Sequence, residues 1–288
     1  MNYPIDKNLV KATIKKRPEN ADKTTIGALL SVCGSYGMAG AAIMSSKAAL
    51  RSGIGLLKLM AAKSIYPILA TSVPEAVFYP VDDNFLSDFN FKEKSRYCGA
   101  VLAGCGLSVN NATRELVENI VLESEIPIVL DADALNIVAE NTSILASAKS
   151  DIVITPHDRE FARLLGCYPD MLKGRREELA LKFAERYGVI VVLKGYKTIV
   201  ACPDGDLLYN EELGNAGMAV GGSGDVLAGI ISSFIAQGFD MFKAAASGVY
   251  IHALAGDIAK SKYGEISMLP TDIIDCLPEA FKSIDNSF

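Results

Sequence analysis

The 288-residue chain is predicted to fold as one α/β domain, residues 1–288, around a central, mostly parallel sheet. Short apolar, β-branched runs alternate with amphipathic helical patterns along the chain. Strands that are apolar throughout are typical of a parallel sheet covered by helices on both faces. Half of the residues are hydrophobic, which is enough for a large core, and no Pro/Ser-rich linker or internal repeat divides the chain.

The order of these patterns predicts each element. Strands are expected in residues 26–34, 53–61, 99–104, 126–133, 150–156, 188–195 and 198–205. Helices are expected in residues 39–53, 110–124, 174–188, 225–238, 240–262 and 269–284. Ligands of such open sheets bind beyond the carboxyl ends of the strands, so functional residues are expected directly after strands.

Composition argues against several classes of function. The formal net charge of −6 argues against nucleic-acid binding, which needs a basic face. No apolar run approaches the roughly 18 residues of a membrane span, and the N-terminus lacks a signal-peptide core. The six cysteines include no CxxC pair, so we expect reduced thiols in a cytoplasmic protein.

A glycine-rich stretch, GNAGMAVGGSGDVLAGII at residues 214–231, precedes a predicted helix. Glycines allow positive φ angles and close approach of a ligand to the main chain. The N–H groups of Gly221, Gly222, Ser223 and Gly224 could then point into one concavity, together with the positive end of the helix dipole. The stretch therefore predicts an anion hole for a phosphoryl group, with a closely packed turn as the alternative.

Asp225 lies in the first turn of that helix. A carboxylate there can simply complement the helix dipole. Beside an anion hole, however, it would repel the ligand unless it has a chemical role. We therefore predict that Asp225 is a general base that takes the proton from a hydroxyl group attacking phosphorus.

Two further motifs follow predicted strands. In ITPHDREFARLLG (residues 154–166), Thr155 is a plausible N-cap, Pro156 fits the first helical position and Asp158 completes a capping box. His157 then projects from a helix start, although a surface histidine is the plain alternative; the other histidine, His252, is interpreted as structural. In VLDADALN (residues 129–136) two acids, Asp131 and Asp133, end a strand; helix capping is the plain account, and a role near magnesium or substrate is the alternative.

The glycine-rich stretch resembles the signature of the NAD(P)H-hydrate dehydratases, a branch of the ribokinase-like superfamily, whose usual form reads GNPGMATGGTGDVLxGxI. The resemblance extends over nearly the whole chain. It implies a ribokinase-like three-layer αβα sandwich. Where the family commonly shows GPGLG, this chain has GCGLS, with Cys105 in place of the proline and Ser108 in place of the last glycine.

The resemblance also implies the roles of individual residues. It implies Asp225 as the catalytic base. The residues that it places on the adenine nucleotide are Lys194, Gly195, Tyr196, Lys197, Thr198 and Gly224. The residues that it places on the hydrated nicotinamide substrate are Gly40, Ala41, Gly106, His157, Asn215 and Asp225. The metal ligands stay unknown.

The implied activity is dehydration of the S epimer of hydrated NADH or NADPH, with ADP or ATP as phosphoryl donor and Mg²⁺ bridging the phosphates. No partner epimerase domain is recognised, and the resemblance then favours ADP. A homo-oligomer, for example a tetramer, is also implied. Two alternatives stay open: a small-molecule kinase of the same superfamily, of the thiazole or pyrimidine type, and a catalytically silent nucleotide sensor.

Overall fold

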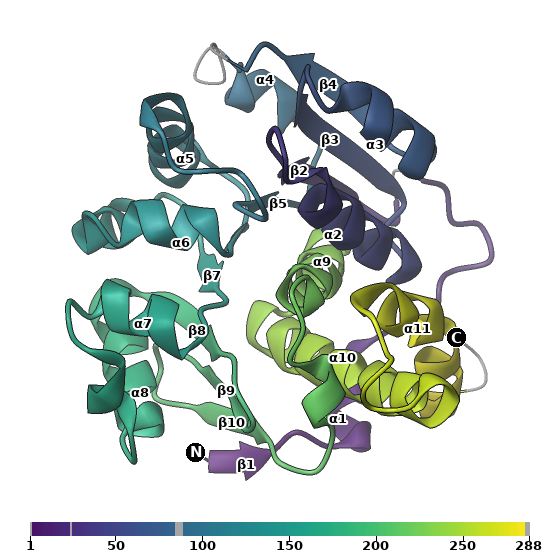
Figure 1. The fold of residues 1–288 in the computed structure, drawn as a ribbon, viewed down its shortest axis with the longest axis vertical. Coiled ribbons are helices and arrows are strands. Elements are labelled where there is room, and N and C mark those ends of the chain that lie inside the picture. Colours follow the sequence, from purple (N-terminus) through teal and green to yellow (C-terminus); the bar gives the residue numbers. More distant parts are fainter. Residues whose placement is uncertain (1, 24, 84–88, 286–288) are drawn as a thin grey trace.

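The computed structural model describes residues 2–23, 25–83 and 89–285 and shows a ten-stranded sheet with helices on both faces (Figure 1). The strand order is β1-β10-β9-β8-β7-β6-β5-β2-β3-β4. Within this sheet β9 is antiparallel to both of its neighbours, and every other pairing is parallel. The predicted α/β class with a mostly parallel sheet is confirmed.

All seven predicted strands are present, and three strands were missed. The predicted ones are β2 (Ala28–Val32), β3 (Leu56–Ala62), β5 (Ala100–Ala103), β6 (Ile128–Leu130), β7 (Ile152–Ile154), β8 (Val189–Leu193) and β9 (Thr198–Ala201). The missed ones are β1 (Asn2–Pro4), β4 (Val77–Val81) and β10 (Leu207–Asn210). Strands β1 and β4 form the two edges of the sheet and each contains a proline, a residue that edge strands tolerate and that weakens the strand pattern.

The six predicted helices are also present. They are α2 (Ala39–Arg51), α5 (Asn111–Glu123), α8 (Arg176–Tyr187), α9 (Ser223–Ala236), α10 (Met241–Tyr263) and α11 (Pro270–Ile284). The remaining α-helices are short: α1 (Lys7–Thr13), α3 (Tyr66–Ser72), α4 (Phe91–Lys94), α6 (Asp133–Val138) and α7 (Asp158–Leu164). The start of α7 was expected from its capping residues, whereas the other four segments, of seven residues or fewer, are too short to display a helical period clearly.

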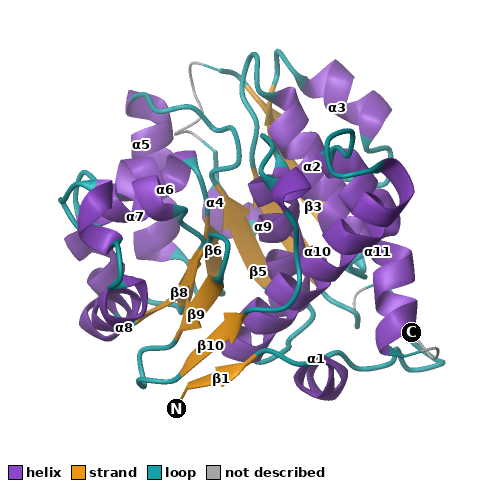
Figure 2. Cartoon of the chain, turned by 60° about the horizontal axis from the view of Figure 1, so that its bottom comes forward, coloured by secondary structure: helices purple, strands orange, loops and turns teal. Residues whose placement is uncertain are grey.

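The strands bury both of their faces, and this produces three layers. Neighbouring residues of one strand enter different cores: Leu29 packs with α2, α9, α10 and α11, whereas Leu30 packs with α5, α7 and α8. Figure 2 shows these two helical layers on opposite sides of the sheet. None of the described helices combines the length and the apolar character that crossing a membrane requires.

Helix α9 is buried along nearly its whole length between the sheet and the helices α2, α10 and α11. Gly229 permits the close crossing with α2, because a Cβ atom there would lie 2.2 Å from the carbonyl oxygen of Ser45. Gly248 of α10 likewise permits close packing of α10 against α9, because a Cβ atom there would lie 2.6 Å from Cγ1 of Ile231. These contacts place the N-terminus of α9 beside the carboxyl ends of the central strands (Figure 1).

Candidate active site

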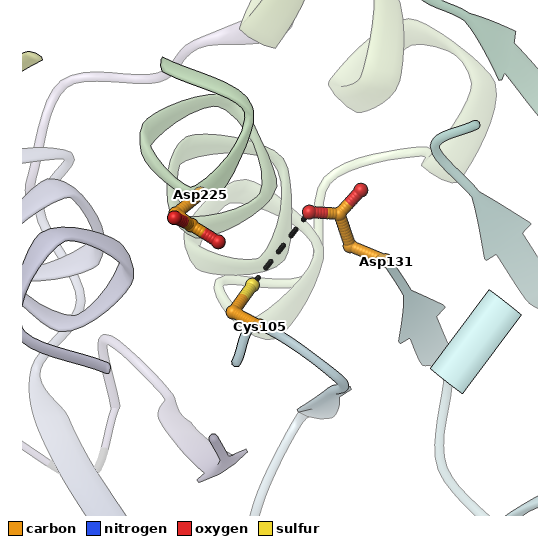
Figure 3. A group of neighbouring side chains, drawn as sticks. All are labelled: Cys105, Asp131 and Asp225. Carbon is orange, nitrogen blue, oxygen red and sulfur yellow. Dashed lines mark hydrogen bonds between the residues drawn. The ribbon is translucent and has the colours of Figure 1, made fainter. Parts of the chain in front are cut away.

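Three side chains with potential ligand or proton-transfer atoms meet where the central strands end. Cys105 follows β5, Asp131 follows β6, and Asp225 lies in the first turn of α9 (Figure 3). One donor atom from each lies within 4.8 Å of the others. Asp225 is partly exposed, whereas Cys105 and Asp131 are buried. The sequence singled out Asp225 but left Asp131 as a helix cap, and the structure places the two carboxylates together.

The environment of Asp225 raises the pKa of its carboxyl group from 3.8 to about 6. Burial is the largest cause, and the negative charge of Asp131 is the next; a hydrogen bond with the Cys105 thiol and the charge of Lys194 act in the opposite direction. A carboxylate with this pKa is ionised at neutral pH and is a stronger base than an ordinary aspartate. The electrostatics therefore suit the predicted role.

The glycine-rich stretch contains two kinds of glycine. Gly214 and Gly222 have positive φ angles, of 102° and 103°, and Gly222 is the N-cap of α9. Gly217 instead allows close packing, since a Cβ atom there would lie 2.4 Å from the carbonyl oxygen of Glu265. Gly221 is open, because a Cβ atom on it would meet no other atom within 4 Å, and Gly224 faces the Lys194 ammonium. The packing interpretation therefore holds at Gly217, whereas the anion hole at Gly221 to Gly224 stays a prediction.

Ser223 differs from the other residues predicted for the anion hole. It is buried, its N–H donates to the carbonyl oxygen of Val220 at 3.2 Å, and its hydroxyl contacts Nε2 of His252 at 3.2 Å. Burial, followed by the charge of Lys194, lowers the pKa of His252 to about 4, so its ring is neutral and supports the start of α9 from α10. The structural interpretation of His252 fits this contact.

The buried Asp131 and the largely buried Lys194 form an ion pair beside the first turn of α9. The ammonium of Lys194 lies 2.6 Å from Oδ1 of Asp131, and the hydroxyl of Thr155 donates to the same oxygen at 2.7 Å. Asp131 is 1% exposed. Burial alone would lower the pKa of Lys194, but the charge of Asp131 opposes it, and the net effect raises that pKa. Lys194 is therefore positively charged at neutral pH. Its ammonium lies against Gly224, because a Cβ atom on that glycine would be 3.1 Å from Nζ.

The turn that follows Lys194 is held by Arg176, a residue that sequence reasoning missed. From the start of α8, Arg176 donates to the carbonyl oxygens of Leu193, Lys194 and Lys197 and pairs with Asp158 at 2.9 Å. Gly195 makes room for this guanidinium, since a Cβ there would lie 2.6 Å from Nη2.

The other residues predicted in this turn face outward or are bonded within it. Tyr196 is 93% exposed. Lys197 pairs with Glu211, and the hydroxyl of Thr198 donates to the carbonyl oxygen of Gly195 at 3.2 Å. Lys194 alone among the five turn residues extends into the cluster around Asp225.

The predicted capping box at Thr155 is wrong. His157 is the N-cap of α7: its Nδ1 accepts hydrogen bonds from the N–H groups of Arg159 and Glu160, and the carboxylate of Glu160 accepts from the N–H of His157 at 2.8 Å. Thr155 directly follows β7, and its hydroxyl donates a hydrogen bond to Asp131 instead of capping the helix. A parallel bridge nevertheless pairs the main chains of His157 and Lys194, so both lie at one edge of the site.

Two predicted substrate residues that are distant in the sequence, Gly106 and Ala41, meet. Gly106 has a φ of 63°, and a Cβ on it would lie 2.8 Å from Cβ of Ala41 in the first turn of α2. Gly40 beside it is open, because a Cβ there would have no neighbour within 4 Å. Ser108, which replaces a family glycine, keeps a left-handed φ of 66°, and its hydroxyl contacts that of Ser35 at 2.7 Å.

Asn215 organises the glycine-rich stretch through α10. Its side-chain amide donates to Asp257 at 2.9 Å, and its side-chain oxygen accepts from the N–H of Gly217 at 3.0 Å. The second carboxylate oxygen of Asp257 accepts from the N–H of Gly214 at 2.9 Å. Asn215 therefore holds the loop that precedes Gly221, while a direct contact with substrate stays a prediction.

The cluster of Cys105, Asp131 and Asp225 suits Mg²⁺ poorly. Mg²⁺ takes oxygen ligands, and one of these three donors is a thiol. Oδ1 of Asp131 also already accepts hydrogen bonds from the ammonium of Lys194 and the hydroxyl of Thr155. Among the described residues this is the one group of His, Cys, Asp and Glu side chains at metal-binding spacing, and its donor set does not fit Mg²⁺.

An antiparallel β9 within a mostly parallel sheet, and a glycine-rich helix start beside an acid, define the chain as a ribokinase-like enzyme. The hydroxyethylthiazole kinase of Pyrococcus horikoshii shares this fold with a TM-score of 0.64 at 16% identity, over 98% of this chain and 95% of that one. The family model described as NAD(P)H-hydrate dehydratase matches residues 29–279. The chain belongs to this family, as its motifs predicted.

Individual relatives agree with the family match. The ADP-dependent (S)-NAD(P)H-hydrate dehydratase of Neisseria meningitidis is 39% identical over 253 residues, covering 87% of this chain and 83% of that protein. The crystal structure of the ADP/ATP-dependent NAD(P)H-hydrate dehydratase from Bacillus subtilis, co-crystallised with ATP and Mg²⁺, has a TM-score of 0.87 at 29% identity, over 98% and 99% of the two chains. The chain spans about half, 53%, of the bifunctional repair enzymes that it also matches.

Proposed function

We propose that this protein repairs the S epimer of hydrated NADH and NADPH by a dehydration that consumes ADP or ATP. The observation that carries the proposal is Asp225, a carboxylate whose pKa is raised to about 6 and which lies in the first turn of α9 beside the open main chain of Gly221. The names of the Neisseria and Bacillus relatives support the substrate and the phosphoryl donor.

The reaction proceeds in two steps. Asp225 takes the proton from the ring hydroxyl, and the resulting oxygen attacks the terminal phosphorus, which breaks the bond to the leaving AMP or ADP. The lone pair of the ring nitrogen then expels inorganic phosphate, and loss of a proton from the neighbouring ring carbon to solvent restores the double bond of the reduced nicotinamide. Phosphorylation is needed because a hydroxyl group is a poor leaving group and phosphate is a good one.

Two kinds of positive field would stabilise the migrating phosphoryl group. One is the set of N–H groups at the start of α9, which point along the positive end of the helix dipole. The other is the ammonium of Lys194, which lies beside Gly224 in that same turn. The proposed hole thus combines main-chain dipoles with one formal charge, which suits a protein of net charge −6.

Residues at the edge of the cluster would hold the substrates. Gly40, Ala41 and Gly106 offer a main-chain surface of small residues for a flat ring, and His157 lies beside Lys194. The turn from Lys194 to Thr198 would contact the nucleotide. A Mg²⁺ ion, if the reaction uses one, would be held mainly through the phosphates. Homo-oligomer formation, for which a tetramer is the suggested assembly, and a cytoplasmic location remain predictions.

The decisive experiment is incubation of the purified protein with hydrated NADH and either ADP or ATP. The near-ultraviolet absorbance of reduced nicotinamide and the release of inorganic phosphate are followed together. The proposal expects both to rise in equal amounts. Accumulation of a phosphorylated product without phosphate release would indicate the small-molecule kinase, and nucleotide binding without either signal would indicate the silent sensor.

A further inference from the structure

Asp131 is a buried carboxylate to which the proposed reaction assigns no role. Its Oδ1 accepts hydrogen bonds from Lys194 and Thr155, at 2.6 and 2.7 Å, and its Oδ2 lies 3.7 Å from the sulfur of Cys105. These partners follow three other strands, β8, β7 and β5. A carboxylate held from three directions has one orientation, and it in turn orients its partners.

The partner whose position matters most is Lys194. Three carboxylates surround its ammonium. It binds Asp131 at 2.6 Å and lies 4.0 Å from Glu160, and the third carboxylate, Asp225, has an oxygen within 4.8 Å of one of Asp131. If Lys194 paired with Asp225 instead, it would neutralise the proposed base and leave its place beside Gly224. The hydrogen bond to Asp131 prevents this, and it keeps the ammonium 3.1 Å from the point that a Cβ on Gly224 would occupy.

We propose that Asp131 is a positioning residue: it holds the Lys194 ammonium over the first turn of α9, where the phosphoryl group would bind, and keeps it away from the Asp225 carboxylate. The inference rests on the proposed function, in which Asp225 must stay free to accept a proton. Nothing in the signature motif indicates this role, because Asp131 and Lys194 are 63 residues apart in the sequence.

The electrostatic interactions around Asp225 and Lys194 agree with the proposed role of Asp131. The titratable groups that interact electrostatically with Asp225 or with Lys194 include Cys33, Cys105, Asp131, Asp133, Glu160 and His252, and the two residues also interact with each other. After burial, the charge of Asp131 is the largest cause of the raised pKa of Asp225. Asp131 therefore strengthens the base by repulsion as well as by retaining Lys194.

Two substitutions, Asp131→Asn and Lys194→Gln, should shift the pKa of Asp225 in opposite directions, and this tests the inference. Asp131→Asn removes the repulsion and releases Lys194 toward Asp225, and both changes lower the pKa of Asp225. The substitution Lys194→Gln removes a nearby positive charge and should raise that pKa. A residue with only a structural role would not move the pKa in these opposite directions.

The measurement is the titration of Asp225 in the full-length protein without substrate, followed by ¹³C NMR after labelling of the aspartate side chains and assigned with Asp225→Asn. We expect a midpoint of about 6 in the wild-type protein. It should fall by about one pH unit in Asp131→Asn and rise in Lys194→Gln. Asp151→Asn is the matched control, because Asp151 is exposed and precedes β7 at the opposite end of the sheet.

Kinetics provide the second measurement. The acid limb of kcat/KM should move to lower pH in Asp131→Asn, and the plateau should fall by about tenfold because Asp225 becomes a weaker base. An unchanged Asp225 titration in a folded Asp131→Asn protein would overturn the inference; if that variant does not fold, an unchanged titration in Lys194→Gln would do so. Absence of turnover by the wild-type protein would instead refute the proposed function, so the two failures are distinguishable.

Discussion

The start of α9 and the turn at residues 194–198, which extends Lys194 into the same site, are built in opposite ways. The start of α9 depends on missing side chains: Gly222 is its N-cap at a φ of 103°, and Gly221 leaves open space. The turn depends on one long side chain from elsewhere, Arg176, which binds three of its neighbouring carbonyl oxygens. Substitutions that add a side chain at the N-cap glycine should therefore disturb the first region, and substitutions that shorten Arg176 should disturb the second.

The largest expected effect comes from the one reactive group in the first region. Asp225→Asn should reduce turnover by about 10²- to 10⁴-fold, since it removes the general base. The nucleotide dissociation constant, measured by calorimetry, should change little because the main-chain N–H groups remain. Turnover that survives this substitution would refute the assignment of Asp225 as the base.

The same substitution should stabilise the protein. The folded-state pKa of about 6 exceeds the ordinary 3.8, so the folded state binds more protons between these pH values and loses stability as the pH rises through this window. An asparagine avoids the cost of the buried charge, which is at most about 3 kcal/mol at neutral pH. Thermal melts of Asp225→Asn should therefore show a gain at pH 7.5 that disappears below about pH 4. A gain of equal size at both pH values would contradict the raised pKa.

Gly222→Ala should show how strongly the first region depends on its backbone. A φ of 103° disfavours alanine by about 1–2 kcal/mol, and the new methyl group would also press on Met44. Displacement of the adjacent N–H groups should lower kcat by about tenfold to a hundredfold. Gly221→Ala is the matched control, because its Cβ would meet no atom within 4 Å, and it should retain kcat if the N–H groups alone form the hole.

Arg176→Gln should loosen the second region and leave the first intact. The loss of its hydrogen bonds to the turn should raise the KM for nucleotide by about tenfold, with a smaller effect on kcat. Arg175→Gln is the control, since Arg175 pairs with the half-exposed Glu178 at the surface and its loss should be nearly neutral. Equal effects of the two substitutions would remove the distinction between the two regions.

Most of the fold was predictable because its pattern is local. Runs such as residues 188–195 and 225–238 are long and apolar enough to identify strands and helices without knowledge of their partners. The missed strands β1, β4 and β10 are short or contain proline, and their pairing with the sheet outweighs their weak pattern. The error at Thr155 has a similar cause, since the distant Asp131 binds the hydroxyl that local reasoning assigned to a helix cap.

Residues that are neighbours in the chain were enough to indicate the α/β class, the family, and Asp225 beside a glycine-rich helix start. Three other features required the folded chain: Asp131 holds Lys194, Arg176 supports the turn after it, and Gly106 meets Ala41. These contacts join strand ends and loops that are far apart in the sequence. Their energies depend on distances of a few ångströms, which exist only after the sheet has assembled.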